Sequence, residues 1–148
     1  MGNGNVLVVE DDDTIRRLLI DLLAQHSRAN VEGARDGVEA LHLISMQRYA
    51  VVLLDVMMPK MSGIDLLDSV HAMLSDPSLK TLDSRPAVIV ITATAASALP
   101  AEVLEHRFPG LVRAVLRKPL DMSALTALVG QFLGDPETAP AAGDRSPA

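Results

Sequence analysis

Residues 51–55 read Val51-Val52-Leu53-Leu54-Asp55, an uninterrupted apolar run that ends in a carboxylate. A run of β-branched and leucine residues without polar alternation is typical of a strand that is buried on both faces of a parallel sheet. Three further runs have a similar composition, at residues 6–9, 88–91 and 112–116, the last with Arg113 and Ala114 inside it. We therefore expect four strands buried on both faces.

Helical patterns lie between these runs. In the clearest one we expect five apolar residues to face the core, and Asp12 or Asp13 to cap the helix; the five are Ile15, Leu18, Leu19, Leu22 and Leu23. Strands alternating with helices imply right-handed crossovers and a three-layer α/β sandwich. The remaining expected elements are a weak strand around Val31, helices opening at Asp36 and at Ser62-Gly63, a short helix near 100–106, and a last helix near 123–133 capped by Asp121 or Ser123.

The length of 148 residues and the 49% hydrophobic content predict one domain with a proper core. We place this domain at residues 1–134. From residue 135 onward the sequence turns to Pro, Ala, Gly and Ser without a periodic apolar face, which predicts a disordered tail over 135–148. Residues 75–86 are expected to form a long surface connection.

Charge and composition exclude several classes of protein. The formal net charge of -6 disfavours nucleic-acid binding, which needs clustered Lys and Arg. No apolar run approaches the length that spans a bilayer, and no basic segment precedes an apolar stretch at the N-terminus, so we expect a cytoplasmic protein without membrane contact. The absence of cysteine excludes disulfides and thiolate zinc sites.

Polar residues gather at the carboxyl ends of the predicted strands, where ligands bind in open parallel α/β sheets. Glu10 and Asp11 follow the first strand, Asp55 and Thr92 end two others, and Lys118 follows the last. Carboxylates within about 4 Å of one another repel by roughly 1 kcal/mol per pair in water, and by more in a less polar cleft. The sequence therefore predicts a cation at this edge of the sheet.

A hard divalent cation such as Mg²⁺, or Mn²⁺ in its place, fits carboxylate and carbonyl oxygens, whereas the absence of clustered His and Cys argues against zinc. Lys118 and the Thr92 hydroxyl could contact the oxygens of a phosphoryl group. A carboxylate can act as the nucleophile by forming an aspartyl phosphate. Together these residue types predict phosphoryl chemistry.

Four motifs, in this order, resemble the response-regulator receiver family of the CheY-like superfamily over about residues 5–133. They are Val6 to Asp11, then Leu53 to Pro59 with Gly63 four positions later, then Ile91-Thr92-Ala93, and Lys118-Pro119. The resemblance implies a flavodoxin-like sandwich of five parallel strands in the order 2-1-3-4-5 with five helices. It also implies a cis peptide bond before Pro119.

The same resemblance assigns roles to residues. It makes Asp55 the phosphoacceptor, Thr92 the switch hydroxyl and Lys118 the site's lysine; the implied metal ligands are Glu10, Asp11, Asp55 and the Met57 main-chain carbonyl. It implies a two-component signalling protein that phosphorylates and dephosphorylates only itself. As a stand-alone receiver, it would take the phosphoryl group from a sensor histidine kinase or phosphotransfer protein and signal to a separate downstream protein, as a monomer or weak dimer.

The chain departs from the family pattern at Val115, where receivers often carry an aromatic residue. Coupling between Thr92 and the partner-binding face through a rotating aromatic ring is therefore in doubt. A rearrangement of that face by another route stays open. Thr94 competes with Thr92 for the hydroxyl role, because residues two apart point to the same face of a strand; the family pattern favours Thr92. Pro100 and Pro109 indicate a short or irregular fourth helix.

Plainer interpretations apply to other polar residues. Asp12 and Asp13 are expected to cap and charge the first helix rather than to bind metal. The side chains of Met57, Met58 and Met61 are expected to pack. The four histidines lack ligand spacing and are expected at the surface; they are His26, His42, His71 and His106.

The sequence leaves two other functions to consider. A phosphatase of the haloacid dehalogenase type also uses an aspartyl phosphate, but aligning Asp12 and Thr14 with its signature puts Glu10 at the nucleophile position. The better alternative is a receiver-shaped binding module that is never phosphorylated.

Overall fold

The computed structural model describes residues 4–56, 63–76, 86–92 and 101–133, the side chain of Ala101 excepted. In these ranges five parallel strands form one sheet in the order β2-β1-β3-β4-β5, which confirms the predicted flavodoxin-like topology. The strands are β1 (Asn5–Val9), β2 (Asn30–Ala34), β3 (Val51–Asp55), β4 (Ala87–Thr92) and β5 (Val112–Arg117). The helices are α1 (Asp13–His26), α2 (Gly37–Met46), α3 (Gly63–Leu74), α4 (Ala101–Arg107) and α5 (Met122–Leu133).

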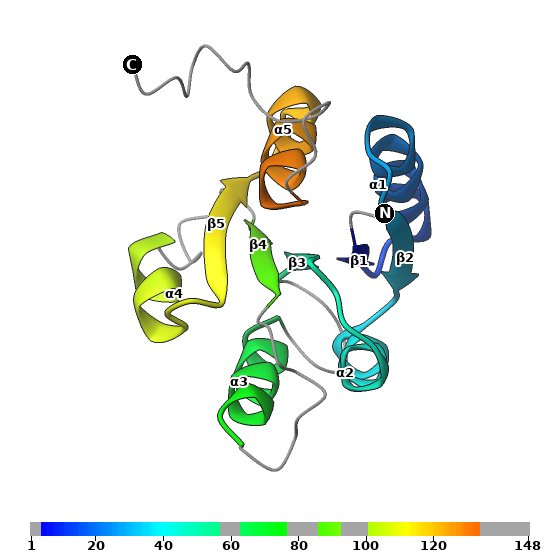
Figure 1. The fold of residues 1–148 in the computed structure, drawn as a ribbon. Helices are drawn as coiled ribbons and strands as arrows, with labels where there is room; N and C mark the ends of the chain where they lie inside the picture. Colours follow the sequence, from blue (N-terminus) through cyan, green and yellow to red (C-terminus); the bar gives the residue numbers. More distant parts are fainter. Residues whose placement is uncertain (1–3, 57–62, 77–85, 93–100, 134–148) are drawn as a thin grey trace, which may run out of the picture.

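The helices cover the sheet on both sides, which gives the three layers that the alternation of elements predicts (Figure 1). Helices α1 and α5 lie on one face, and α2, α3 and α4 lie on the other. Because successive strand residues point to opposite faces, each strand contributes to two separate apolar cores. In β3, for example, Val51 and Leu53 pack under α1 and α5, while Val52 and Leu54 pack against the other three helices.

Aspartates begin three of the helices as N-caps. The carboxylates of Asp12, Asp36 and Asp121 each accept a hydrogen bond from the backbone N–H three residues ahead, at 3.0, 2.8 and 3.2 Å. Each bond satisfies one of the donors that a helix N-terminus leaves without a partner. The structure thereby decides both open choices of cap, for Asp12 over Asp13 and for Asp121 over Ser123.

The predicted apolar face of α1 is partly wrong. Leu19 and Leu23 are buried, but Ile15 is 36% exposed and Leu18 is 54% exposed. The stripe of apolar residues is wider than the strip of the helix that contacts the sheet, and Leu19 and Leu23 are the ones that face the core. Ile15 and Leu18 are left on the outer surface near the start of the helix.

The expectation of burial on both faces holds for β1, β3 and β4 but is wrong for β5. In β5, Val112 is buried, while Arg113 and Arg117 are exposed. The reason is that β5 is an edge strand, and edge strands of sheets commonly carry charged side chains.

Several sequence expectations lie outside the described residues. These are the tail over 135–148, most of the connection over 75–86, and the surroundings of Met57, Met58, Met61, Thr94 and Pro100. The division into a domain over 1–134 and a tail stays a prediction. No helix in the described ranges is both long and apolar enough to cross a membrane.

The burial difference along α1 predicts unequal costs of truncation. Leu19→Ala should lower the free energy of unfolding by about 3 kcal/mol, because it leaves a cavity in a packed core. Leu18→Ala should change it by less than about 0.5 kcal/mol, because the side chain is largely in solvent. Urea unfolding followed by circular dichroism measures both, and equal losses would contradict this assignment of the helix face.

Candidate functional site

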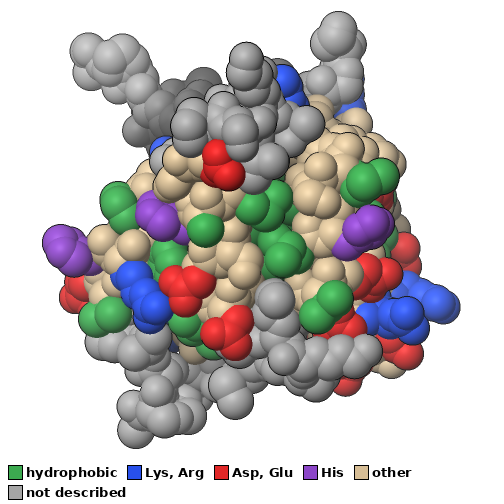
Figure 2. Space-filling view, turned by 90° about the horizontal axis from the view of Figure 1, so that it is seen from below, with side chains coloured by type: hydrophobic (Ala, Val, Ile, Leu, Met, Phe, Trp, Pro, Cys, Tyr) green, Lys and Arg blue, Asp and Glu red, His purple; other side chains and the backbone are tan. Residues whose placement is uncertain are grey.

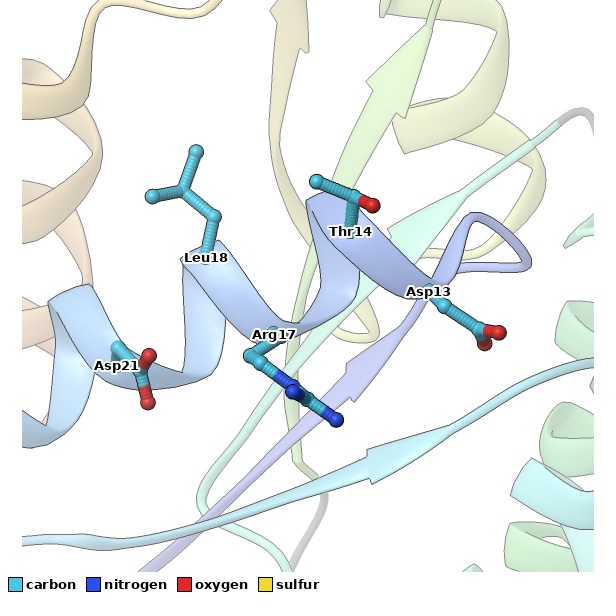
Figure 3. A pocket seen from close by; sticks show the side chains of 5 residues that line it. All are labelled: Asp13, Thr14, Arg17, Leu18 and Asp21. Carbon is cyan, nitrogen blue, oxygen red and sulfur yellow. The ribbon is translucent and has the colours of Figure 1, made fainter.

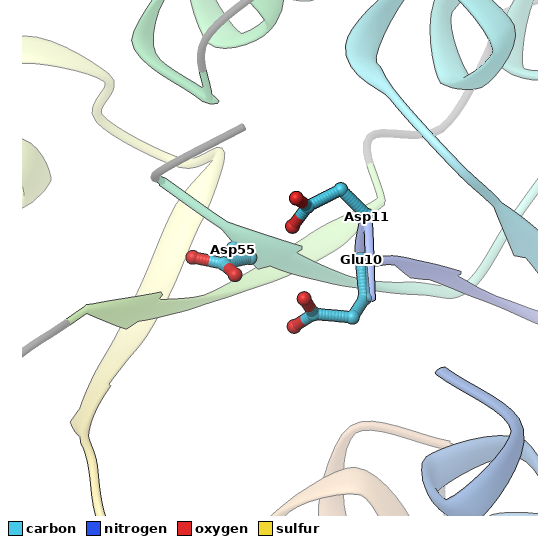
Figure 4. Close-up of side chains that lie close together, drawn as sticks. All are labelled: Glu10, Asp11 and Asp55. Carbon is cyan, nitrogen blue, oxygen red and sulfur yellow. The ribbon is translucent and has the colours of Figure 1, made fainter. Parts of the chain in front are cut away.

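The carboxyl ends of four neighbouring strands bring the predicted site residues to one edge of the sheet. Val9 of β1 pairs with Leu54 of β3, so the next residues, Glu10 and Asp55, follow side by side. The side chains of Glu10, Asp11 and Asp55 lie close together (Figure 4), and one carboxylate oxygen from each lies within 4.8 Å of the others. The structure thus brings together the three predicted acidic residues.

Glu10 is a buried carboxyl group of the cluster. It is only 3% exposed, and burial raises its pKa to about 7, with a further upward contribution from the nearby Asp55. The backbone N–H of Asp12 donates to Oε2 of Glu10 at 3.2 Å, and this bond and the Lys118 charge act in the opposite direction without cancelling the rise. Desolvation penalises the charged form of a carboxyl group, so a cation would relieve a cost that is built into this position.

The adjacent aspartates divide between the cluster and the helix. Asp11 is exposed but takes part in the acidic cluster. Asp12 caps α1, and Asp13 forms an ion pair with Arg16 that lowers the pKa of Asp13. The prediction that Asp12 and Asp13 belong to the helix is consistent with these contacts, and only Glu10 and Asp11 extend toward Asp55.

Lys118 reaches the cluster from the other side. Its Nζ lies 3.4 Å from Oδ2 of Asp55, and its backbone N–H donates to the carbonyl of Thr92 at 2.9 Å. This second bond fixes the start of the lysine side chain beside the end of β4. The Lys118–Pro119 peptide bond is cis, as the family resemblance implies, and Thr92 is buried, with 4% exposure, at the end of β4.

Arg16 is a residue of the site that the sequence analysis did not single out. Its Nη1 donates to the main-chain carbonyl of Glu10 at 2.9 Å, which ties the turn carrying Glu10 and Asp11 to α1. The side chain passes Gly33 of β2, where a Cβ atom would lie 2.8 Å from Cδ1 of Ile20 and 3.0 Å from Cδ of Arg16. A glycine inside a strand often marks such a close approach, but it does not indicate which side chain approaches, so no signal in the sequence names Arg16.

Gly63 has a similar role behind Asp55. A Cβ atom at this position would lie 2.7 Å from Cα of Val56 and 3.1 Å from the carbonyl oxygen of Asp55. The Gly63 N–H also donates to the Val56 carbonyl at 3.0 Å. The first residue of α3 therefore packs directly on the backbone that carries Asp55, which explains the glycine that the sequence places there.

The donor set suits a hard divalent cation. Three carboxylates form the cluster, and the Lys118 ammonium lies 3.4 Å from one of them, Asp55. No His or Cys belongs to the cluster found among the described residues. Oxygen donors of this kind fit Mg²⁺ or Mn²⁺ and are a poor match for zinc. The predicted Met57 carbonyl lies outside the described residues.

The histidines lie away from this cluster. His26, His42 and His106 are exposed, as expected. His71 departs from the expectation, because it is partly buried on α3 with its ring edge-on to Phe108 at a centroid separation of 6.1 Å. Its Nδ1 has no hydrogen-bond partner among the described residues.

Comparison with known proteins identifies similar sequences. The response regulator receiver domain family matches residues 6–130. Protein-glutamate methylesterase/protein-glutamine glutaminase 4 of Myxococcus xanthus is 34% identical over 116 residues, which cover 78% of this chain and 30% of that protein. Response regulator MprA of a Mycobacterium species is 34% identical over 117 residues, which cover 76% of this chain and 50% of that protein. The chain thus spans half the length of these relatives or less.

Solved structures show the same fold. The receiver domain of Francisella response regulator 1452 superimposes with a TM-score of 0.69 at 26% identity, covering 88% of this chain and 97% of that one. Vibrio cholerae chemotaxis protein CheY4 superimposes with a TM-score of 0.68 at 26% identity, covering 87% of this chain and 98% of that one.

The raised pKa of Glu10 predicts a pH-dependent stability in metal-free solution. The folded state holds the Glu10 proton up to about pH 7, whereas the unfolded chain releases it near 4.5, so Glu10 lowers the free energy of unfolding as the pH rises between these values. The loss is at most about 3 kcal/mol. In urea unfolding with EDTA, Glu10→Gln should therefore gain stability relative to the wild type from pH 5 to pH 8.

Glu105→Gln is the matched control, because Glu105 is exposed on α4. Its stability relative to the wild type should stay constant over the same pH range. A constant difference for Glu10→Gln as well would contradict the raised pKa.

Proposed function

The chain belongs to the response regulator receiver domain family of two-component systems, and from this premise we propose that Asp55 is its phosphoacceptor. One observation carries the proposal: the Asp55 carboxylate, only 3% exposed, lies between the Glu10 and Asp11 carboxylates and the Lys118 ammonium. Such an arrangement offers a nucleophile and, next to it, a positive charge for a phosphoryl group.

The proposed reaction is an in-line transfer. An oxygen of Asp55 attacks the phosphorus of a phosphohistidine or a small phosphodonor, and the P–O bond to Asp55 forms as the bond to the donor breaks. The Lys118 ammonium lies on the Asp55 side of the site and would stabilise the phosphoryl oxygens. The Thr92 hydroxyl would donate a hydrogen bond to one of them. Positioning and electrostatics supply most of the catalysis.

A divalent ion belongs in this scheme, because the carboxylates need a counter-charge. Glu10, Asp11 and Asp55, with the Met57 carbonyl, would hold Mg²⁺ or Mn²⁺. The bound ion would neutralise charge on the phosphoryl oxygens. Arg16 would keep the Glu10–Asp11 turn in place through its bond to the Glu10 carbonyl.

The proposed output is a change in protein binding. Phosphorylation adds negative charge beside Thr92, at the end of β4. Val115 pairs with Val90 of β4 and packs against the core that includes Leu104 of α4. A shift of β4 can therefore reach the surface formed by β5 and α4 without an aromatic ring. Receiver domains are generally non-enzymatic. We propose that this one, too, acts through a downstream protein, as a monomer or weak dimer in the cytoplasm.

Surface charge does not favour nucleic acid as the partner. On the face formed by α2, α3 and α4, the coloured Lys and Arg side chains lie beside acidic ones rather than in one basic field (Figure 2). Arg107 pairs with Asp68 at 3.1 Å, and Arg35 lies 3.8 Å from Glu39. This interspersed pattern fits the net charge of -6 and supports a protein partner.

The start of α1 is the surface that we propose for the phosphodonor protein. It flanks Glu10 and Asp11 directly, and it exposes Ile15 and Leu18. A cavity of about 470 Å³ lies on this helix; Thr14 and Leu18 point to one side, and Asp13, Arg17 and Asp21 to the other (Figure 3). An apolar patch rimmed by charges is typical of a protein interaction site.

Direct phosphorylation tests the acceptor. With acetyl phosphate and Mg²⁺, the intact mass should rise by one phosphoryl group, and this gain should be absent in Asp55→Ala and in an EDTA-treated sample. Asp68→Asn is the matched control and should be phosphorylated normally, because Asp68 pairs with Arg107 away from the site. No gain under any condition would favour the alternative, a binding module that works without phosphorylation.

A charged substitution on α1 tests the docking of the kinase separately from the phosphorylation reaction. With a histidine kinase that phosphorylates the wild-type chain, Leu18→Glu should lower the transfer rate roughly tenfold, because it places a charge in an apolar contact. Phosphorylation by acetyl phosphate should be unchanged. Met46→Glu is the control, because Met46 is 69% exposed at the far end of α2. Equal transfer to Leu18→Glu and to the wild type would remove α1 from the docking surface.

A further inference from the structure

The amino ends of the strands, at the edge of the sheet opposite to Asp55, surround a second polar cavity. It measures about 430 Å³ and is formed by the starts of β1, β4 and β5, the segment before β3, and the end of α5. Five-residue strands with a rise of about 3.3 Å per residue place it roughly 15 Å from Asp55. This cavity is therefore separate from the acidic cluster.

Main-chain hydrogen bonds hold the floor of the cavity in place. The Ala50 N–H donates to the carbonyl of Asn5 at 2.8 Å, and the Ala87 N–H donates to the carbonyl of Ala50 at 2.9 Å. The Asn5 side chain donates to the carbonyl of Arg48 at 3.0 Å, which fixes the backbone that carries this arginine. Gly4, with φ of 94°, lies so close that a Cβ atom would be 3.0 Å from Cβ of Ala50.

Two arginines supply the charge of this cavity. Arg48 lines it from the segment before β3, and Arg113 lines it from the start of β5. The Arg113 guanidinium carbon lies 5.2 Å from the centroid of the Phe132 ring, a cation–π contact that holds the group beside the cavity. None of the described lining residues is acidic, although the chain carries a net charge of -6.

We propose that this cavity binds the phosphate group of a small phosphorylated molecule. Guanidinium groups match phosphate with paired hydrogen bonds, and the Arg113 group is already held beside the cavity by the Phe132 ring. A volume of about 430 Å³ falls in the range of small-molecule sites. The rigid floor keeps the two arginine-bearing segments in place before a ligand arrives, which lowers the cost of binding. The proposal does not depend on the role of Asp55.

Calorimetry with the full chain in EDTA tests the site. The chelator removes divalent metal ions, so that phosphate cannot bind through a metal at the acidic cluster. The probes are inorganic phosphate, AMP and glucose 6-phosphate, with adenosine and glucose as their uncharged counterparts. At least one phosphorylated probe should bind in a 1:1 ratio with a Kd on the order of 0.1–1 mM, and the uncharged probes should not bind. The probe with the lowest Kd shows which kind of molecule carries the phosphate group.

Arginine variants locate the binding. Arg113→Gln and Arg48→Gln should each weaken it roughly tenfold or more, because each removes a charged hydrogen-bond donor. Arg35→Gln is the control, because Arg35 has a 72% exposed side chain at the opposite end of the sheet, and its affinity should equal that of the wild type. Urea unfolding verifies that each variant folds.

Three results would overturn the proposal. The first is that no phosphorylated probe binds at about 10 mM, far above the expected Kd. The second is that binding survives both Arg113→Gln and Arg48→Gln. The third is that Arg35→Gln weakens binding as much as they do, which would indicate general charge attraction instead of a site.

Discussion

The repulsion among three carboxylates at the carboxyl edge of the sheet is the constraint on which this protein's chemistry depends. The parallel pairing of β1 with β3 fixes the side-by-side placement of Glu10 and Asp55, so their charges cannot separate without breaking the sheet. Burial adds to the cost and raises the pKa of Glu10 to about 7. The Lys118 ammonium, 3.4 Å from Asp55, offsets one charge and leaves the need for a cation.

The surrounding structure holds the three mutually repelling carboxylates in position. The apolar cores on the two faces of the sheet keep the strands rigid, with Val51 and Leu53 in one core and Val52 and Leu54 in the other. Closer to the site, Arg16 binds the Glu10 carbonyl, and α3 begins at a glycine packed against the backbone of Asp55. Folding energy from the cores is thereby available to keep like charges together, as is common at functional sites.

Much of this arrangement could be predicted from the sequence, because buried parallel strands and the polar residues that end them are strong local signals. The three-layer α/β fold and the meeting of Glu10, Asp11 and Asp55 follow from such signals, whereas the strand order 2-1-3-4-5 follows from the family resemblance. The outward position of Leu18 and the exposure of β5 do not, because they depend on which strip of a helix meets the sheet and on which strand lies at its edge. Likewise, the contact of Arg16 with the Glu10 carbonyl depends on space that Gly33 leaves in a neighbouring strand.

Calorimetric titration of Mg²⁺ into the chelator-treated chain measures whether the acidic cluster takes up a cation. The account predicts one Mg²⁺ per chain, with binding that strengthens as the pH rises through about 7 because Glu10 must release its proton. It also predicts that Asp11→Asn abolishes the binding and that Asp68→Asn leaves it unchanged. Absence of Mg²⁺ binding at pH 8, or equal binding by Asp11→Asn, would contradict the account.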